Sequence, residues 1–194
     1  MIQNKLSAKK IAFIITFTAA SILINYSGSV LAGIIAFPLY LDSILTIAVV
    51  ALCGLIPGLI CAALSNLLLC IFAHTGILFM TCHLSTAIVA WLVFRNENKK
   101  NPSCSFSTSS FIWVGFISAI TNSIIGDSIS NFIYAANTSI PQVDNAVQGI
   151  YVVTRNLTYA AYFGGTITNL VDKLICATIS LFVYRALRRF STDL

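Results

Sequence analysis

Long apolar runs dominate the chain, and polar positions are largely confined to the short stretches between them. Runs such as SILTIAVVALCGLIPGLICAAL do not alternate apolar and polar residues, as the strands of a transmembrane β-barrel do. A helix needs about 20 apolar residues to cross a bilayer. The pattern therefore predicts an all-α polytopic membrane protein, because unpaired backbone groups cannot face hydrocarbon.

We expect six transmembrane helices within a single integral membrane domain, 1–194. Their approximate ranges are 8–27, 43–56, 59–73, 77–94, 111–134 and 164–187. Pro38 separates the first two runs, and Ile56-Pro57-Gly58 predicts a tight turn between the second and third. Since those two runs are short, a re-entrant hairpin is an alternative for them, and it leaves the parity of crossings unchanged.

Two connections are long enough to matter for topology. Residues 95–105 form a hydrophilic linker, and residues 135–163 form an expected outer loop. The segment AVQGIYVVTRNLTYAAYF within that loop is apolar enough for a seventh crossing, but Arg155 lies in its middle. We interpret it as an outer loop or a short helix lying across the bundle.

The N-terminal segment also has features of a signal peptide. A basic start and an apolar core precede Val30-Leu31-Ala32, which resembles a small-residue cleavage site. We prefer an uncleaved first helix, and removal of the segment is the alternative.

Composition agrees with a membrane environment. Hydrophobic residues make up 58% of the chain and charged residues 9%, and the mean hydropathy is +0.91. An ordinary soluble domain carries about 25% charged residues, so this chain lacks the polar surface that would cover a water-soluble core.

The net charge of +5 arises from basic residues that flank the apolar runs. They are Lys5, Lys9, Lys10, Arg95, Lys99, Lys100, Arg185, Arg188 and Arg189. With six crossings all nine fall on one side, which the positive-inside rule makes the cytoplasmic side of the cell membrane. This predicts both termini inside, and it does not resemble the basic, aromatic-interleaved patch of a nucleic-acid-binding protein.

The remaining ionisable residues fall in the outer half of the expected bundle. A charge within the membrane costs at least ~2.5–3.5 kcal/mol, so it persists where it is paired or faces a watered cavity. We therefore expect an outer-face polar cavity that binds a small molecule. The candidate substrate-binding residues are Asp42, Asn66, His83, Asn122, Asp127, Asn131, Arg155, Asn169, Asp172 and Lys173.

Structural roles compete with this interpretation. Asp172 and Lys173 are adjacent, and neighbouring side chains point about 100° apart on a helix, so we expect each to have its own partner. Asp172 paired with Arg155, and Lys173 with Asp127, would hold helices together. Asparagine in membrane helices is often interhelical glue, which we favour for any single Asn, whereas we favour a ligand or gating role for the charged set.

The sequence gives little support for a metal site, a disulfide framework or a catalytic site. The six cysteines form no CxxC pair, and five of them lie in apolar runs as small buried hydrophobes do. His74 and His83 are separated by a turn, with no further ligand at metal-binding spacing. No H-E-x-x-H, G-x-S-x-G or phosphate-binding G-x-x-x-x-G-K-[ST] element is present. We expect no enzyme, no cofactor and no metal site.

Small residues recur every fourth position at the start of the first helix: Ala8, Ala12, Thr16 and Ala20. Such a stripe allows another helix to approach closely. It packs either inside the monomer or against a partner, and Ala8, Ala12 and Thr16 are the candidate docking residues.

Three segments carry a family resemblance. FPLYLDSILTIAVVALCGLIPGLICAALSNLL, 37–68, resembles the early segment of substrate-binding S components of energy-coupling factor (ECF) vitamin transporters, with matches at Asp42, Thr46, Gly54, Pro57, Gly58 and Asn66. NLVDKLICATIS, 169–180, resembles the Asp-Lys element in the last helix of some members. Ala8-Lys-Lys-Ile-Ala12 is similar to the docking motif of the family.

The resemblance implies a six-helix subunit that captures a vitamin-like micronutrient from outside. It would assemble with a transmembrane scaffold and two ATPase subunits, and release its substrate inward by toppling in the membrane. We expect a small polar heterocycle, neutral or zwitterionic, stacked on rings such as Tyr134, Tyr159, Tyr162 and Phe163. The alternatives are a ligand-sensing or accessory membrane subunit and a self-sufficient secondary carrier, although no inverted repeat supports the carrier.

Overall fold

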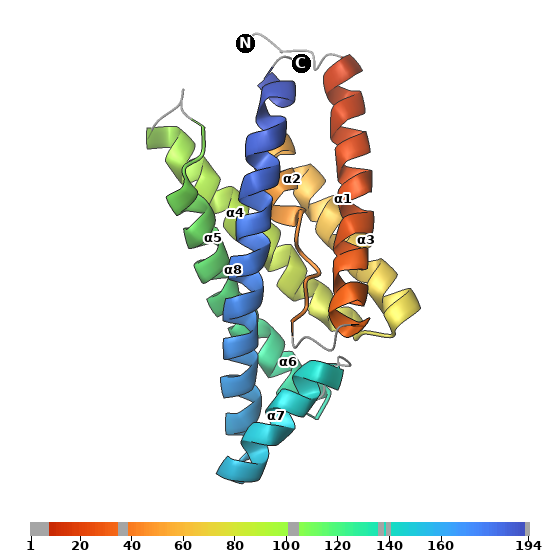
Figure 1. The fold of residues 1–194 in the computed structure, drawn as a ribbon, viewed down its shortest axis with the longest axis vertical. Coiled ribbons are helices and arrows are strands. Elements are labelled where there is room, and N and C mark those ends of the chain that lie inside the picture. The colour runs from red at the N-terminus through yellow and green to blue at the C-terminus, as the bar shows by residue number, and fades with distance from the viewer. Residues whose placement is uncertain (1–7, 35–38, 101–104, 136–137, 139–140, 193–194) are drawn as a thin grey trace.

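The computed structural model of the chain describes residues 8–34, 39–100, 105–135, 138 and 141–192 (Figure 1). These described residues form helices and connecting turns, without a strand. The helices are α1 (Ala8–Ile34), α2 (Thr46–Cys53), α3 (Leu55–Ala73), α4 (Met80–Lys100), α5 (Thr108–Asn122), α6 (Ser128–Ile133), α7 (Pro141–Thr154) and α8 (Leu157–Thr192). A 3-10 turn, η1 (Ile77–Phe79), precedes α4, and a π-helical segment, η2 (Ser123–Asp127), joins α5 to α6.

Four segments are long and apolar enough to cross a membrane. They are Ala8–Ile34, Leu55–Ala73, Ile77–Lys100 and Thr108–Ile133. Large apolar side chains on these helices face outward, among them Ile15, Leu23 and Phe72, each more than 60% exposed. An outward apolar surface on long helices suits lipid, so the expected helical, multi-pass membrane protein agrees with the structure.

In one elongated bundle α1 and α8 run lengthwise, whereas α3 and α4 run obliquely (Figure 1). The starts of α1 and α5 and the ends of α4 and α8 lie at the same end of the molecule. The end of α1 and the starts of α4 and α8 lie at the opposite end, with α7 packed across α8 there. We call these the terminal end and the α7 end.

The second apolar run differs from the prediction. A helix was expected over 43–56, but α2 covers only Thr46–Cys53, about two turns, and non-helical residues 39–45 lead into it. The turn into α3 lies at Gly54, whose φ of 92° and ψ of −175° suit glycine, rather than at 56–58. Pro57 lies in the first turn of α3, where its missing N–H is tolerated.

Other helices extend beyond their expected limits. Within the expected linker 95–105, α4 continues to Lys100, and residues 101–104 are outside the described part of the chain. α1 ends at Ile34 rather than near 27, and α8 begins at Leu157 rather than 164. The expected outer loop 135–163 thus contains both α7 and the first turns of α8. The expected limits were set by hydropathy alone. A helix can continue beyond its apolar run into polar surroundings when its backbone hydrogen bonds are satisfied.

The two ends of the bundle differ in their interiors. The main apolar core lies toward the terminal end, where Phe94, Phe106, Phe111 and Tyr184 stack with ring centroids 4.5–5.5 Å apart. The interior toward the α7 end instead holds polar side chains and a cavity. The fold thus separates a packed apolar half from a polar half.

Candidate ligand-binding cavity

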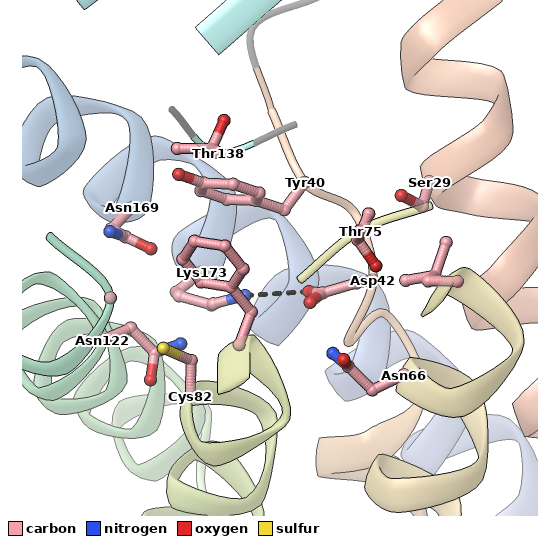
Figure 2. A pocket seen from close by; sticks show the side chains of 13 residues that line it. Ser29, Tyr40, Asp42, Asn66, Thr75, Cys82, Asn122, Thr138, Asn169 and Lys173 are labelled. Atoms are coloured by element: carbon pink, nitrogen blue, oxygen red, sulfur yellow. Dashed lines mark hydrogen bonds and ion pairs between the residues drawn. The ribbon is translucent and has the colours of Figure 1, made fainter. Parts of the chain in front are cut away.

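The cavity lies between α1, α3, α4, α5 and α8, and Tyr40 and Asp42 line it from the non-helical residues before α2 (Figure 2). The centres of water-sized spheres can occupy about 50 Å³ of it, and about 540 Å³ is free of protein atoms when open solvent at its mouth is included. It is lined by Ser29, Tyr40, Asp42, Asn66, Leu69, Thr75, Phe79, Cys82, Asn122, Gly126, Thr138, Asn169 and Lys173. Five of these are expected site residues: Asp42, Asn66, Asn122, Asn169 and Lys173.

An ion trio of Lys173, Asp42 and Asp172 supplies the charge at the cavity. Asp42 and Lys173 line the wall, whereas Asp172, an expected ligand-binding residue, lies behind them and does not line the cavity. Lys173 Nζ lies 3.0 Å from Asp42 Oδ1 and 2.8 Å from Asp172 Oδ2, and it also donates to Ser43 Oγ at 3.0 Å. Asp172 is fully buried and Lys173 is 2% exposed. In such surroundings a lysine charge persists because carboxylates are in direct contact with it.

Asp172 also fixes the backbone of the segment before α2. Its Oδ1 accepts hydrogen bonds from the N–H groups of Tyr40, at 3.0 Å, and Leu41, at 2.7 Å. Leu41 has a φ of 46°, in the left-handed region that a branched side chain rarely adopts. Carboxylate bonds to two successive N–H groups stabilise this bend, which directs Asp42 toward Lys173.

The expected pairing of these charges is wrong. Asp172 and Lys173 contact each other although their Cα–Cβ bonds diverge, because the long lysine side chain can curl back to its neighbour. Arg155 does not pair with Asp172: it is exposed, with a φ of 54°, in the turn between α7 and α8. Asp127 does not pair with Lys173 either, since Asp42 occupies that role.

A second polar layer lies behind the cavity wall. Asn25 accepts the N–H of Leu45 at 2.7 Å and donates to Thr46 Oγ1 at 2.9 Å and to Ser65 Oγ at 3.3 Å. Thr46 Oγ1 lies 2.7 Å from His83 Nε2. His83 is thus buried in this layer and is not among the lining residues, contrary to the expectation that it binds ligand directly.

The three asparagines of the wall differ in their bonding. Asn122 accepts from Ser85 Oγ at 2.7 Å and donates to Thr86 Oγ1 at 3.1 Å, which is the interhelical role foreseen for single asparagines. Asn66 is 3% exposed, and its Oδ1 has no hydrogen-bond partner among the described residues. Asn169 is 4% exposed and faces the cavity from α8 (Figure 2).

Asp127 lies beside the cavity rather than in its wall. It ends the π-helical segment η2 and is 5% exposed, and its Oδ2 has no partner in the described part of the chain. It packs against Gly165 of α8 so closely that a Cβ at that position would overlap the carboxylate. Asn131, another expected ligand residue, is half-buried on α6 and does not line the cavity.

The aromatic wall also differs from the prediction. Tyr40 and Phe79 line the cavity, and Lys173 Nζ lies 5.8 Å from the centroid of the Tyr40 ring. Tyr134 stacks on Phe79 from outside with centroids 5.5 Å apart. Tyr159, Tyr162 and Phe163 are not among the lining residues, because they lie on the first turns of α8, beyond the cavity.

Sequence reasoning missed several residues of the wall and its support. Ser29, Tyr40, Thr75 and Phe79 carry no motif, and only folding brings them together. Asn25 had a signal, since an amide in the middle of an otherwise apolar helix needs a polar partner.

The small-residue stripe of α1 lies on the outer surface. Ala8, Ala12, Thr16 and Ala20 are exposed, whereas the buried face of the helix consists of Thr18, Ser21, Asn25, Gly28 and Ala32. The alternative in which the stripe packs inside the monomer is therefore wrong.

The thiols and the second histidine form no metal-ligand set. Cys53, Cys61, Cys70, Cys82 and Cys176 are free thiols, and Cys104 lies outside the described residues. His74 is exposed at the end of α3. Over the described ranges no group of three His, Cys, Asp or Glu side chains is placed to hold a metal ion.

This arrangement can hold a small polar solute. Carboxylate, ammonium and amide groups occupy fixed positions beside two aromatic rings, which is the composition of a specific ligand pocket. Comparison of the chain with models of protein families, with curated proteins and with solved structures gave no significant match.

Proposed function

We propose that this protein is the solute-capturing membrane subunit of an importer, similar to the S components of ECF transporters. It crosses the membrane six times with both termini in the cytoplasm. The second crossing combines residues 39–45 with α2, and the sixth is α8. A small micronutrient enters the cavity from outside, and a transmembrane scaffold with two ATPase subunits supplies the energy for its release inward.

The observation that carries the proposal is the cavity around the ion trio. Its polar groups come from helices far apart in the sequence and lie in the half of the bundle toward the α7 end. A purely structural ion pair needs no open space beside it, whereas Asp42 and Lys173 border a cavity with amides and aromatic rings on its other walls.

The distribution of basic residues supports the orientation. Among described residues outside the cavity wall, eight basic side chains lie near the terminal end: Lys9, Lys10, Arg95, Lys99, Lys100, Arg185, Arg188 and Arg189. Arg155 lies at the α7 end. The positive-inside rule then places the terminal end in the cytoplasm and the cavity on the outer side.

The exposed stripe of α1 supports the assembly with a scaffold. Small side chains on the outer surface of a membrane helix permit close helix contact, and Ala8 and Ala12 lie at the proposed cytoplasmic end. The sequence contains no phosphate-binding loop of its own, which suits a subunit that depends on separate ATPases.

The test is the identification of small molecules that co-purify with the detergent-solubilised full chain. Mass spectrometry of the released molecules is carried out on the wild type, on Asn169→Leu and on the matched control Asn131→Leu. We expect one solute to be enriched with the wild type and the control. Its occupancy should fall at least about tenfold in Asn169→Leu, since a lost hydrogen bond in a pocket corresponds to ~1.4 kcal/mol or more.

Equal retention by Asn169→Leu, or the absence of any enriched molecule, would contradict solute capture in this cavity. A bound solute without co-purifying ATPase subunits would favour the ligand-sensing alternative over the importer.

A further inference from the structure

We propose that the cavity selects a solute with a cationic nitrogen, which binds beside Asp42 on the side away from Lys173. This inference rests on the proposed solute capture and goes further by assigning the charge of the ligand. It is carried by the net charge of the ion trio together with unpartnered oxygen atoms at one corner of the cavity.

The ion trio is not neutral. With both carboxylates ionised and in contact with the ammonium, the trio carries one positive and two negative charges, a sum of −1. An unbalanced charge within a bundle surrounded by lipid is unfavourable by several kcal/mol. Asp172 meets two N–H groups in addition to the ammonium, whereas the Asp42 side chain is 15% exposed in the cavity wall. The excess negative charge is therefore accessible at Asp42.

No other described side chain balances this charge. Apart from Lys173, the basic residues in the described ranges do not line the cavity. His83 lies behind the wall, but its Nδ1 has no acceptor in the described structure, and Nε2 is bonded to the Thr46 hydroxyl. A doubly protonated ring there would leave one N–H without a partner, which is unfavourable.

The corner beside Asp42 offers oxygen atoms to a donor. Asn66, Thr75 and Ser29 lie on the side of Asp42 opposite Lys173 (Figure 2). Asn66 Oδ1 and Thr75 Oγ1 are buried without a partner among the described residues. Buried acceptors without donors are rare in folded proteins, and an ammonium or ring N–H would satisfy them while neutralising Asp42. Tyr40 and Phe79 add aromatic faces, which also attract cations.

The experiment uses three pyridines of similar size that differ in charge. They are nicotinamide methylated on its ring nitrogen, which is cationic, nicotinamide, which is neutral, and nicotinate, which is anionic. The thermal unfolding midpoint of the full chain in detergent is followed by tryptophan fluorescence at millimolar concentrations of each. A ligand that binds only the folded state raises the midpoint. We expect the cation to raise it most.

Matched variants locate the effect. Asp42→Asn removes the charge and should abolish the preference for the cation, while Glu97→Gln, the same change at the terminal end, should retain it. If Asp42→Asn does not fold, Asn66→Leu and Thr75→Val leave the ion trio intact and should each weaken the response to the cation several-fold.

An equal or larger shift with the neutral or anionic ring would overturn the inference, as would no shift with the cation. Sodium chloride and N-methylglucamine chloride are compared as a further control. If only sodium chloride raises the unfolding midpoint, and Asp42→Asn abolishes that rise, the corner binds a sodium ion. That result would overturn the assignment of the corner to the solute. The proposed function and the charge assignment are refuted by different results. If no solute co-purifies, the proposed function is refuted. If the co-purifying solute is neutral or anionic, only the charge assignment is refuted.

Discussion

At the scale of single residues, Lys173 connects two parts of the chain. Its ammonium contacts Asp42 and Ser43 of the segment before α2, and Asp172 beside it on α8. Each carboxylate is tolerable in the interior because this ammonium is present. Removing the ammonium should therefore lower the free energy of unfolding by more than the loss of its contacts alone, because the carboxylates stay behind without a cation.

Lys173→Met should lower the free energy of unfolding by about 3–5 kcal/mol, because it leaves the buried Asp172 and the half-buried Asp42 without a cation. The measurement is denaturant-induced unfolding of the chain in detergent micelles. Adding Asp42→Asn to Lys173→Met should recover part of this loss, since one uncompensated charge disappears. Lys99→Met, at the exposed end of α4, is the control, and its effect should lie within about 0.5 kcal/mol. Equal stability of Lys173→Met and the control would refute the role of the ion trio.

At the scale of elements, the break between residues 39 and 55 decides where the cavity forms. Tyr40 and Asp42, which border the cavity, belong to the non-helical residues 39–45. The chain bends at Leu41, enters α2 only at Thr46 and turns again at Gly54. Asp172 and Asn25 hold this segment through backbone N–H groups that a helix would otherwise bond internally.

Gly54→Ala should destabilise the protein by about 1–3 kcal/mol, because alanine is strained at the glycine's dihedral angles. An added Cβ would meet no atom within 4 Å, so the loss would arise from the backbone alone. The thermal unfolding midpoint measures the effect. Gly149→Ala within α7 also meets nothing within 4 Å and should be neutral or stabilising, since alanine favours helix. A midpoint for Gly54→Ala as high as that for Gly149→Ala would contradict the turn.

At the scale of the whole molecule, the bundle separates its apolar core from its cavity along its length. Aromatic packing occupies the interior of the terminal half, and the cavity occupies the other half. Basic residues gather around the terminal end. Under the positive-inside rule this asymmetry predicts the proposed orientation, with the terminal end in the cytoplasm.

Cysteine labelling in intact cells tests that orientation. In a variant without native cysteines, Arg155→Cys should react with a membrane-impermeant maleimide added outside. Lys99→Cys should react only after the membrane is permeabilised, because it lies at the opposite end of the bundle. The reverse pattern would invert the topology and remove the case for capture from outside.

The helical membrane class could be predicted because it depends on local properties. Apolar run length and the placement of basic residues report directly on the preference of each segment for lipid or water. The same reasoning found five of the lining residues, since polar side chains within apolar runs are conspicuous. It misplaced the α2–α3 turn at 56–58, because proline is usually associated with turns. In the structure the chain turns at Gly54, whose dihedral angles suit glycine, and Pro57 lies within α3.

The sequence by itself thus determined which segments are apolar enough to cross a membrane and which polar residues need a partner. Only the tertiary structure decided the partners. Lys173 and Asp42 are separated by 131 positions, and no local pattern distinguishes Asp42 from Asp127 as the carboxylate that Lys173 meets. That choice depends on a bend at Leu41 stabilised by Asp172, and a contact between distant segments is determined by how all the helices pack together.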